Sequence, residues 1–153
     1  MSGGARYLLD TNIVSETRKT RADERVIAFL GAVDASSLFI SALTVGELRK
    51  GVEIKRRADP DAAARPDAAA RIGTWVEGIE LAFADHILPV DSRVARRWGE
   101  LSAERSRPVI DTLIAATALA HGLTLVTRDT GDRRGINLAV IDPWQAPQSS
   151  NVP

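Results

Sequence analysis

Short apolar runs alternate along the chain with longer stretches in which apolar residues recur at helical spacing. A short apolar run is typical of a buried strand in a parallel sheet, although periodicity alone does not separate it from a helix. The strands expected from these runs lie at 7–9, around 38–40, at 87–88, in LTLVTRDTG (123–131) and in NLAVIDPW (137–144). Helices are expected within 12–34 as one or two helices, within 43–84, within 91–106 and over 108–122. This alternation predicts an α/β fold, a three-layer domain of about five short parallel strands flanked by helices.

The longest helical region is expected to form an arm over about 43–84. Inside it, residues 58–71 read ADPDAAARPDAAAR and contain the hexapeptide PDAAAR twice. This segment is interpreted as a linker or hairpin insertion, and its second copy begins the next helix because Pro is tolerated in a first turn. The helix over 108–122 is apolar nearly all round and is predicted to be buried. We expect a single domain over 1–145 and a mobile polar tail over 146–153.

The amino-acid composition excludes more kinds of functional site than the length of the chain does. The chain of 153 residues has no Cys and two His, so thiolate metal sites and disulfides are excluded and zinc is not favoured. Both His86 and His121 adjoin apolar segments and are interpreted as structural, and Trp75, Trp98 and Trp144 as core or interface anchors rather than base-stacking platforms. Lys+Arg and Asp+Glu are both 20, which leaves no overall basic field. No membrane span or secretory signal is visible, so a soluble, cytoplasmic protein is expected.

Asp10 ends the first apolar run, and two interpretations of it stay open. Asp is common as the cap of a following helix, which is the more ordinary explanation. In open α/β sheets, however, ligands bind at the carboxyl end of the strands, where Asp10 is expected to lie.

Three further acids stand beside apolar segments: Glu47, Asp111 and Asp129. Each has a structural explanation when taken alone, as a partner of a neighbouring Arg or Lys, a first-turn charge or a turn residue. Taken together with Asp10, two strand ends and two helix starts of a parallel sheet tend to meet at one edge. Carboxylates gathered there need a cation, and ligands that are all oxygen suit Mg²⁺ or Mn²⁺.

Four segments in this order carry a resemblance to a known family: LLDTNIVSE, TVGELRKGV, VIDTLIAATA and LVTRDTGD followed by VIDPW. The chain resembles PIN-domain ribonuclease toxins of the VapC family, close to the FitB-like members, over residues 7 to about 144. The resemblance implies a PIN-like fold. It also implies that the chain is the toxin of a type II toxin–antitoxin system and a metal-dependent endoribonuclease that restricts translation or growth.

Carried over to this sequence, the resemblance makes Asp10, Glu47 and Asp111 the acids that hold the metal ion and act in catalysis. The fourth acid differs between family members. In FitB-like members it stands at the position of Asp129, which we favour, and in many others it stands three residues later, at Asp132, which we keep as a second metal ligand. Here Asp132 is followed by Arg133, where those other members have Phe.

Supporting roles follow from the same resemblance. Thr11 and Asn12 are expected to shape the first loop, and Thr127 matches the small hydroxyl residue of the fourth motif. Arginine and lysine beside the acids are candidates for gripping RNA phosphates, although each has a solvated surface position as its alternative. These candidates are Arg49, Lys50, Arg128 and Arg133.

Two rival functions are weighed against the nuclease. A phosphatase of the haloacid-dehalogenase type needs a second Asp where this chain has Asn12, and a later Lys, whereas no Lys follows Lys55. A non-catalytic PIN-fold module regulated by a partner stays open as the alternative. The resemblance further implies a small cognate antitoxin, contact with DNA only through that antitoxin, and a homodimer. The RNA target and the choice between Mg²⁺ and Mn²⁺ are not readable from the sequence.

Overall fold

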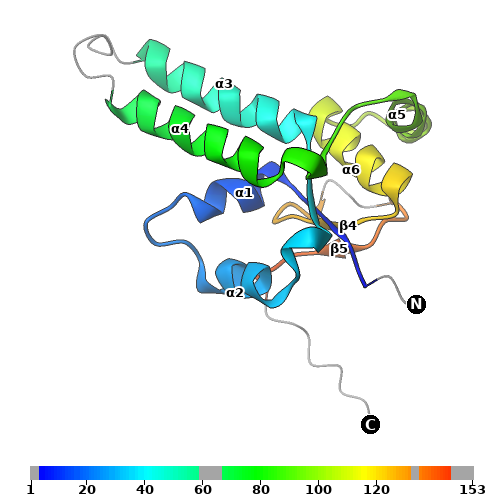
Figure 1. Cartoon of the computed structure of the whole chain (residues 1–153). Helices are drawn as coiled ribbons and strands as arrows, with labels where there is room; N and C mark the ends of the chain where they lie inside the picture. Colours follow the sequence, from blue (N-terminus) through cyan, green and yellow to red (C-terminus); the bar gives the residue numbers. More distant parts are fainter. Residues whose placement is uncertain (1–3, 59–66, 132–134, 146–153) are drawn as a thin grey trace.

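A five-stranded parallel sheet lies at the centre of the molecule (Figure 1). The structure, a computed structural model, describes residues 4–58, 67–131 and 135–145. The strands are β1 (Tyr7–Leu9), β2 (Leu38–Ser41), β3 (Ile87–Leu88), β4 (Thr124–Val126) and β5 (Val140–Ile141). They are ordered β3-β2-β1-β4-β5, and every neighbouring pair is parallel. The predicted strands and their direction are confirmed, and β1 is the middle strand.

Helices connect these strands as the apolar spacing predicts. They are α1 (Thr11–Thr17), α2 (Glu24–Ala32), α3 (Ala42–Ala58), α4 (Asp67–Ala82), α5 (Ser92–Glu104) and α6 (Val109–His121), with short 3-10 turns η1 (Ala35–Ser37) and η2 (Ala84–His86). The stretch 12–34 therefore forms two helices. Asp side chains cap α2 and α5, where Asp23 accepts from the Arg25 N–H and Asp91 from the Val94 N–H. No helix within the described ranges is long and apolar enough to cross a bilayer.

Helices cover both faces of the sheet because successive residues of a strand point to opposite sides. Leu8 packs into one apolar cluster with Ile114 of α6. Its neighbour Leu9 packs into the other cluster with Ile13 of α1 and Val76 of α4. All five side chains are at most 2% exposed. The predicted three-layer arrangement is confirmed, with β1 at its centre.

The helix α6 departs in part from its prediction. Its middle is buried, from Ile114 to Ala118, where α5 and the sheet pack against it. Its first turn is open to solvent, since Val109 is 56% exposed and Ile110 is 39% exposed. Burial all round is therefore wrong for the start of the helix. The helix ends at Gly122, whose φ of 64° is left-handed, a conformation that favours glycine at the end of a helix and agrees with the expected bound at 122.

The predicted arm consists of α3 and α4, which lie side by side and extend away from the sheet (Figure 1). An ion pair joins them, with Arg49 Nη2 3.0 Å from Glu80 Oε1. The linker expected around 59–66 and the tail predicted over 146–153 both lie outside the described residues. The helix expected from the second PDAAAR copy begins at Asp67. The domain limits 1–145 stay a prediction.

Both histidines have structural surroundings, in agreement with their interpretation. His86 Nδ1 lies 2.8 Å from the carbonyl oxygen of Leu38, and its ring stacks on Phe39 with 4.4 Å between centroids. The half-buried His121 ends α6 next to Gly122. Burial lowers the pKa of His121, and the nearby Arg93 guanidinium lowers it further.

Candidate active site

Asp10 stands where β1 ends and α1 begins. Its side chain is 4% exposed, and both oxygens accept hydrogen bonds. The Thr11 backbone N–H donates to Oδ1 at 2.8 Å, which caps α1, and the Thr127 hydroxyl donates to Oδ2 at 2.8 Å. Burying a carboxylate is costly unless donors of this kind replace water. The two interpretations of Asp10, helix cap and site residue at the carboxyl edge, are therefore compatible.

Thr127 joins three parts of the site. It follows β4 directly, and the pairing of Leu9 with Val126 sets it beside Asp10 on the neighbouring strand. The side chain is fully buried. Its hydroxyl donates to Asp10 and accepts from Asn12 Nδ2 at 3.2 Å and from the Asp129 backbone N–H at 3.1 Å. One hydroxyl thus holds the ends of β1 and β4 and the loop after β4 in register.

Glu47 is linked to this group through Thr11. The Thr11 hydroxyl donates to Glu47 Oε1 at 2.7 Å, so a residue next to Asp10 contacts the second turn of α3. The Thr44 hydroxyl, one turn earlier on α3, lies 3.1 Å from Thr11 Oγ1. Thr44 is fully buried and Glu47 is half-buried. This network holds two carboxylates, those of Asp10 and Glu47, on either side of Thr11.

Asn12 fixes the loop that follows β4. Besides its bond to Thr127, its Oδ1 accepts from the Arg128 backbone N–H at 3.3 Å. The Arg128 guanidinium lies over the ring of the buried Trp144, 5.0 Å from its centroid, where a cation is attracted to the aromatic face. These contacts hold the loop after β4, and the expectation that Thr11 and Asn12 shape the first loop stays a prediction.

Asp111 belongs to the same edge of the sheet by topology. It is the third residue of α6, which runs back to the start of β4. A helix that leads into a parallel strand runs opposite to that strand. The first turn of α6 therefore lies at the carboxyl edge of the sheet, where Asp10 and Thr127 directly follow β1 and β4. Asp111 is half-buried. Its carboxylate sits in a first turn, where the helix dipole favours negative charge.

The fourth acid has a looser setting. The Asp129 side chain is exposed, and only its backbone N–H joins the network, through Thr127. Asp132 lies outside the described residues. Across the described ranges, no three His, Asp or Glu side chains are grouped closely enough to hold a metal ion by themselves. The metal ligands named from the sequence stay a prediction.

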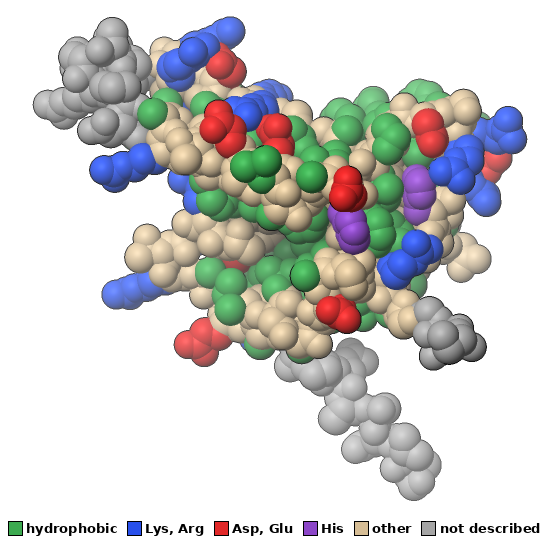
Figure 2. All heavy atoms as spheres, viewed as in Figure 1, with side chains coloured by type: hydrophobic (Ala, Val, Ile, Leu, Met, Phe, Trp, Pro, Cys, Tyr) green, Lys and Arg blue, Asp and Glu red, His purple; other side chains and the backbone are tan. Residues whose placement is uncertain are grey.

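The basic candidates differ in their contacts. Arg49 bonds Glu80 of α4 through Nε and Nη2, at 3.2 and 3.0 Å. Arg128 follows Thr127 and is exposed, as is Lys50 on α3. Arg133 lies outside the described residues. Figure 2 shows that Lys and Arg side chains gather at the outer end of the arm, where Lys55, Arg56 and Arg57 form the last turn of α3. Among the three candidates that the structure describes, Arg49 therefore makes the most side-chain hydrogen bonds within the protein.

Sequence reasoning missed two buried polar residues, one beside the site on α3 and one on α1. Thr44 contacts Thr11, and its only signal is its position three residues before Glu47 on α3. Glu16 of α1 is 5% exposed, and its Oε2 lies 3.0 Å from Lys19 Nζ. Nothing in the polar sequence SET (15–17) distinguishes a buried Glu from an exposed one.

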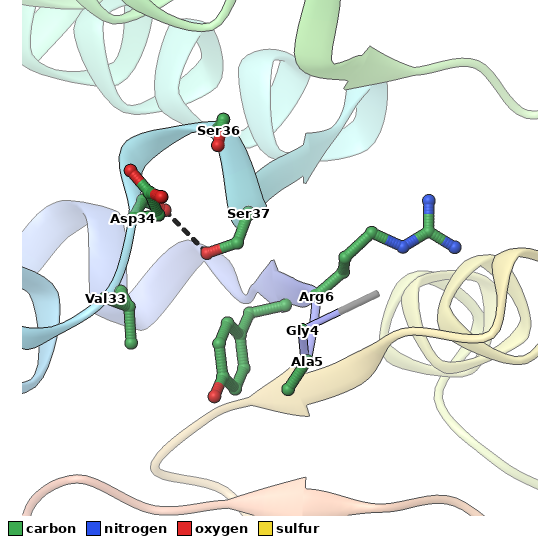
Figure 3. Close-up of a pocket in the computed structure, with 8 residues that line it drawn as sticks. Gly4, Ala5, Arg6, Val33, Asp34, Ser36 and Ser37 are labelled. Atoms are coloured by element: carbon green, nitrogen blue, oxygen red, sulfur yellow. Dashed lines mark hydrogen bonds between the residues drawn. The ribbon is translucent and has the colours of Figure 1, made fainter. Parts of the chain in front are cut away.

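Two cavities lie at opposite ends of β1. One of about 300 Å³ is open to solvent, adjoins Thr11 and Glu47, and is lined by residues of α1, α3 and α4. Another, of about 430 Å³, lies at the start of β1 beside η1 (Figure 3). Arg6 and Asp34 line it, and none of the candidate acids does. The larger cavity is therefore remote from the acid site, and the smaller one adjoins it.

Comparison with known proteins adds a family and its relatives. The sequence pattern of the PIN domain matches residues 7–134. The "VapC ribonuclease Y4jK" of Sinorhizobium fredii is 38% identical over 146 residues, which cover 90% of this chain and 97% of that protein. The "Toxin FitB" of Neisseria gonorrhoeae is 34% identical over 142 residues, which cover 90% of this chain and 97% of that protein.

Solved structures agree with this similarity. The crystal structure of FitAcB from Neisseria gonorrhoeae superposes with a TM-score of 0.75 and 34% identity, over 92% of this chain and 99% of that chain. A toxin–antitoxin complex from Klebsiella pneumoniae superposes with a TM-score of 0.66 and 25% identity, over 92% of this chain and 99% of that chain. The similarity thus extends over both the sequence and the fold.

Proposed function

Because this chain belongs to the PIN domain family, and to the VapC group within it, we propose that it is an endoribonuclease that acts as the toxin of a toxin–antitoxin pair. The observation that carries the proposal is the network at the carboxyl edge, in which Thr11 and Thr127 hold the carboxylates of Asp10 and Glu47. The cap of α1 uses one oxygen of Asp10, and the bond from Thr127 fixes the other oxygen at the edge where α/β sheets bind ligands. The names of its relatives give the reaction, cleavage of RNA.

The donor set of this edge fits Mg²⁺ or Mn²⁺. Carboxylates and hydroxyls supply oxygen only, which these hard cations prefer. Mg²⁺ is often held by one or two carboxylates and completed by waters and substrate phosphate, so it does not require three protein ligands already grouped. In this proposal Asp10, Glu47 and Asp111 hold the ion, and Asp129 with Asp132 complete the acidic edge. When bound, a divalent ion lowers the pKa of water and stabilises charge on the leaving oxygen.

The residues of the chain then have separate tasks in hydrolysis. Thr127 keeps Asp10 in place, and Thr11 fixes one oxygen of Glu47, which leaves the other oxygen to bind. Glu47 or Asp111 orients the attacking water. A bond forms between the water oxygen and phosphorus, the bond from phosphorus to one ribose oxygen breaks, and that oxygen takes a proton. Lys50, Arg128 and Arg133 grip flanking phosphates, and Arg49 joins them if its pair with Glu80 opens.

A protein partner is part of the same proposal. A relative of this fold was solved as a toxin–antitoxin complex, which supports a cognate antitoxin for this chain. DNA contact would then come only through that antitoxin. A homodimer is also expected, and light scattering of the purified protein at several concentrations measures it.

Cleavage of total cellular RNA by purified protein tests the proposal. We expect cutting with Mg²⁺ or Mn²⁺, none with EDTA, and none by Asp10→Asn or Asp111→Asn. Asp91→Asn is a matched control, because it makes the same change at another helix cap, that of α5, which is none of the candidate acids, and Asn caps as well as Asp. Folded protein that cuts no RNA under any condition would favour the interaction module. Cutting that survives both acid substitutions would leave the site without support.

A further inference from the structure

Gly51 of α3 lines the cavity that adjoins Thr11 and Glu47. Gly51 lies inside α3, where glycine is less favourable than alanine because its backbone loses more freedom on folding. No close contact requires it, because a Cβ at this position would meet nothing within 4 Å. The space next to Gly51 is the cavity of about 300 Å³ that also contacts Thr11 and Glu47. The helix therefore leaves room open next to its own catalytic acid.

The cavity has an apolar wall and a basic rim. Ile72 and Trp75 of α4 line it and are half-buried against the main core cluster. Arg18 at the end of α1 and Lys55 in the last turn of α3 line it from the solvent side, and both are exposed. A flat apolar wall with positive charges beside it suits a nucleotide, since a base stacks on an aromatic ring and its phosphate pairs with Arg or Lys.

We propose that this cavity, centred on Gly51, is a subsite for one nucleotide of the RNA next to the bond that is cut, with the base against Trp75 and a phosphate between Arg18 and Lys55. The inference rests on the proposed function, since it places the substrate that Glu47 would act on. The size agrees with one nucleotide, because 300 Å³ is at the lower end of small-ligand pockets. A partner helix would need a longer groove for its successive anchors.

Filling the cavity tests the subsite without damaging the core. Gly51→Leu adds a side chain where nothing lies within 4 Å, and leucine is a better helix former than glycine. Gly78→Leu on α4 is the matched control, because Gly78 is exposed, has the same free space and does not line the cavity. Binding is measured by fluorescence anisotropy with a labelled ten-nucleotide single-stranded RNA of random sequence, in an Asp10→Asn background that cannot cut it.

We expect Gly51→Leu to weaken RNA binding by roughly five- to 150-fold, the range for loss of one stacked base, and Gly78→Leu to leave it unchanged. Trp75→Phe should retain binding, because it keeps an aromatic face, and Trp75→Leu should lose it. Thermal melting of each variant confirms that it is folded.

A charge pair on one helical turn gives a second readout. Lys55→Gln should weaken binding and lower the slope of log Kd against log salt by about 0.7, the value for one phosphate contact on a single strand. Arg56→Gln removes the same charge from the same turn but does not line the cavity, so it should leave the slope unchanged.

Equal RNA binding by Gly51→Leu and Gly78→Leu, in a protein that otherwise cuts RNA, would overturn the subsite and leave the nuclease intact. A wild-type protein that neither binds nor cuts RNA would overturn the nuclease together with the subsite.

Discussion

Replacing Thr127 by valine tests whether one buried hydroxyl holds the acid site together. Valine has nearly the shape of threonine, so the substitution removes the hydroxyl and leaves the packing almost unchanged. The hydroxyl donates to Asp10 Oδ2 and accepts from Asn12 and from the Asp129 N–H, and it is fully buried. Thr127→Val therefore leaves a carboxylate oxygen and two donors without their present partner.

The magnitude follows from these three bonds. A hydrogen bond to a charged group contributes about 1.5–3 kcal/mol to stability, and a neutral one about 1 kcal/mol. Bonds that share one atom are not additive, because waters and neighbouring groups replace part of what is lost. We expect Thr127→Val to lower the free energy of unfolding by about 3 kcal/mol at pH 7. For a domain of this size that corresponds to a decrease in Tm of about 6–12 °C.

Urea denaturation followed by circular dichroism measures the loss, with Thr127→Ser as the control. Serine keeps the hydroxyl and loses one methyl group, so it should cost only about 1 kcal/mol. In an Asp10→Asn background Thr127→Val should cost about 0.5–2 kcal/mol less, because the bond is no longer to a charged group. Equal losses for the valine and serine variants would refute the reasoning, since packing and not the hydroxyl would then hold this position.

Two further predictions concern the end of α6. Gly122→Ala should cost about 1 kcal/mol in urea denaturation, because Gly122 has φ 64° and the added Cβ meets no other atom, so only backbone strain is introduced; an unchanged midpoint would contradict this. Burial lowers the pKa of His121 below its ordinary 6.5, so the unfolded chain binds the proton more readily than the folded one. The contribution of His121 to the free energy of unfolding is therefore fully present above pH 6.5 and falls as the pH drops below it. His121→Gln should flatten the decline in urea midpoint between pH 7.5 and 5.5, and an identical decline in the variant would show that other groups cause it.

Much of the fold was predictable from the sequence because its elements have local signals. Apolar runs such as Tyr7–Leu9 are too short for helices, and the spacing of apolar residues in α3 and α5 is helical. What failed was the start of α6, where Val109 and Ile110 are apolar but exposed. An apolar residue at an open helix end has no sequence signal that separates it from a core residue.

The site was predictable as a set of residues but not as a network. That Thr127 would bond Asp10 depends on β1 and β4 being neighbours, and strand order is not encoded in any local pattern. Thr44 was missed for a similar reason. Its contact with Thr11 depends on the packing of α1 against α3, which no local pattern in the sequence of α3 predicts. Arg49 was named as an RNA contact, but its sequence neighbours gave no sign of Glu80, thirty-one positions away.

The first apolar segment ends at Asp10 because one carboxylate at this position both caps α1 and lies at the carboxyl edge of the sheet. A buried strand that turns at once into a helix leaves N–H groups without partners, and Asp10 accepts the first of them. The same position lies at the carboxyl edge of the middle strand, so its other oxygen faces β4 and meets Thr127. The cap holds the carboxylate in one orientation, and a fixed orientation is what a metal ligand or a water-positioning group requires. Removing the cap bond should therefore affect activity as well as the stability of α1, which is why the two interpretations of Asp10 lead to one site.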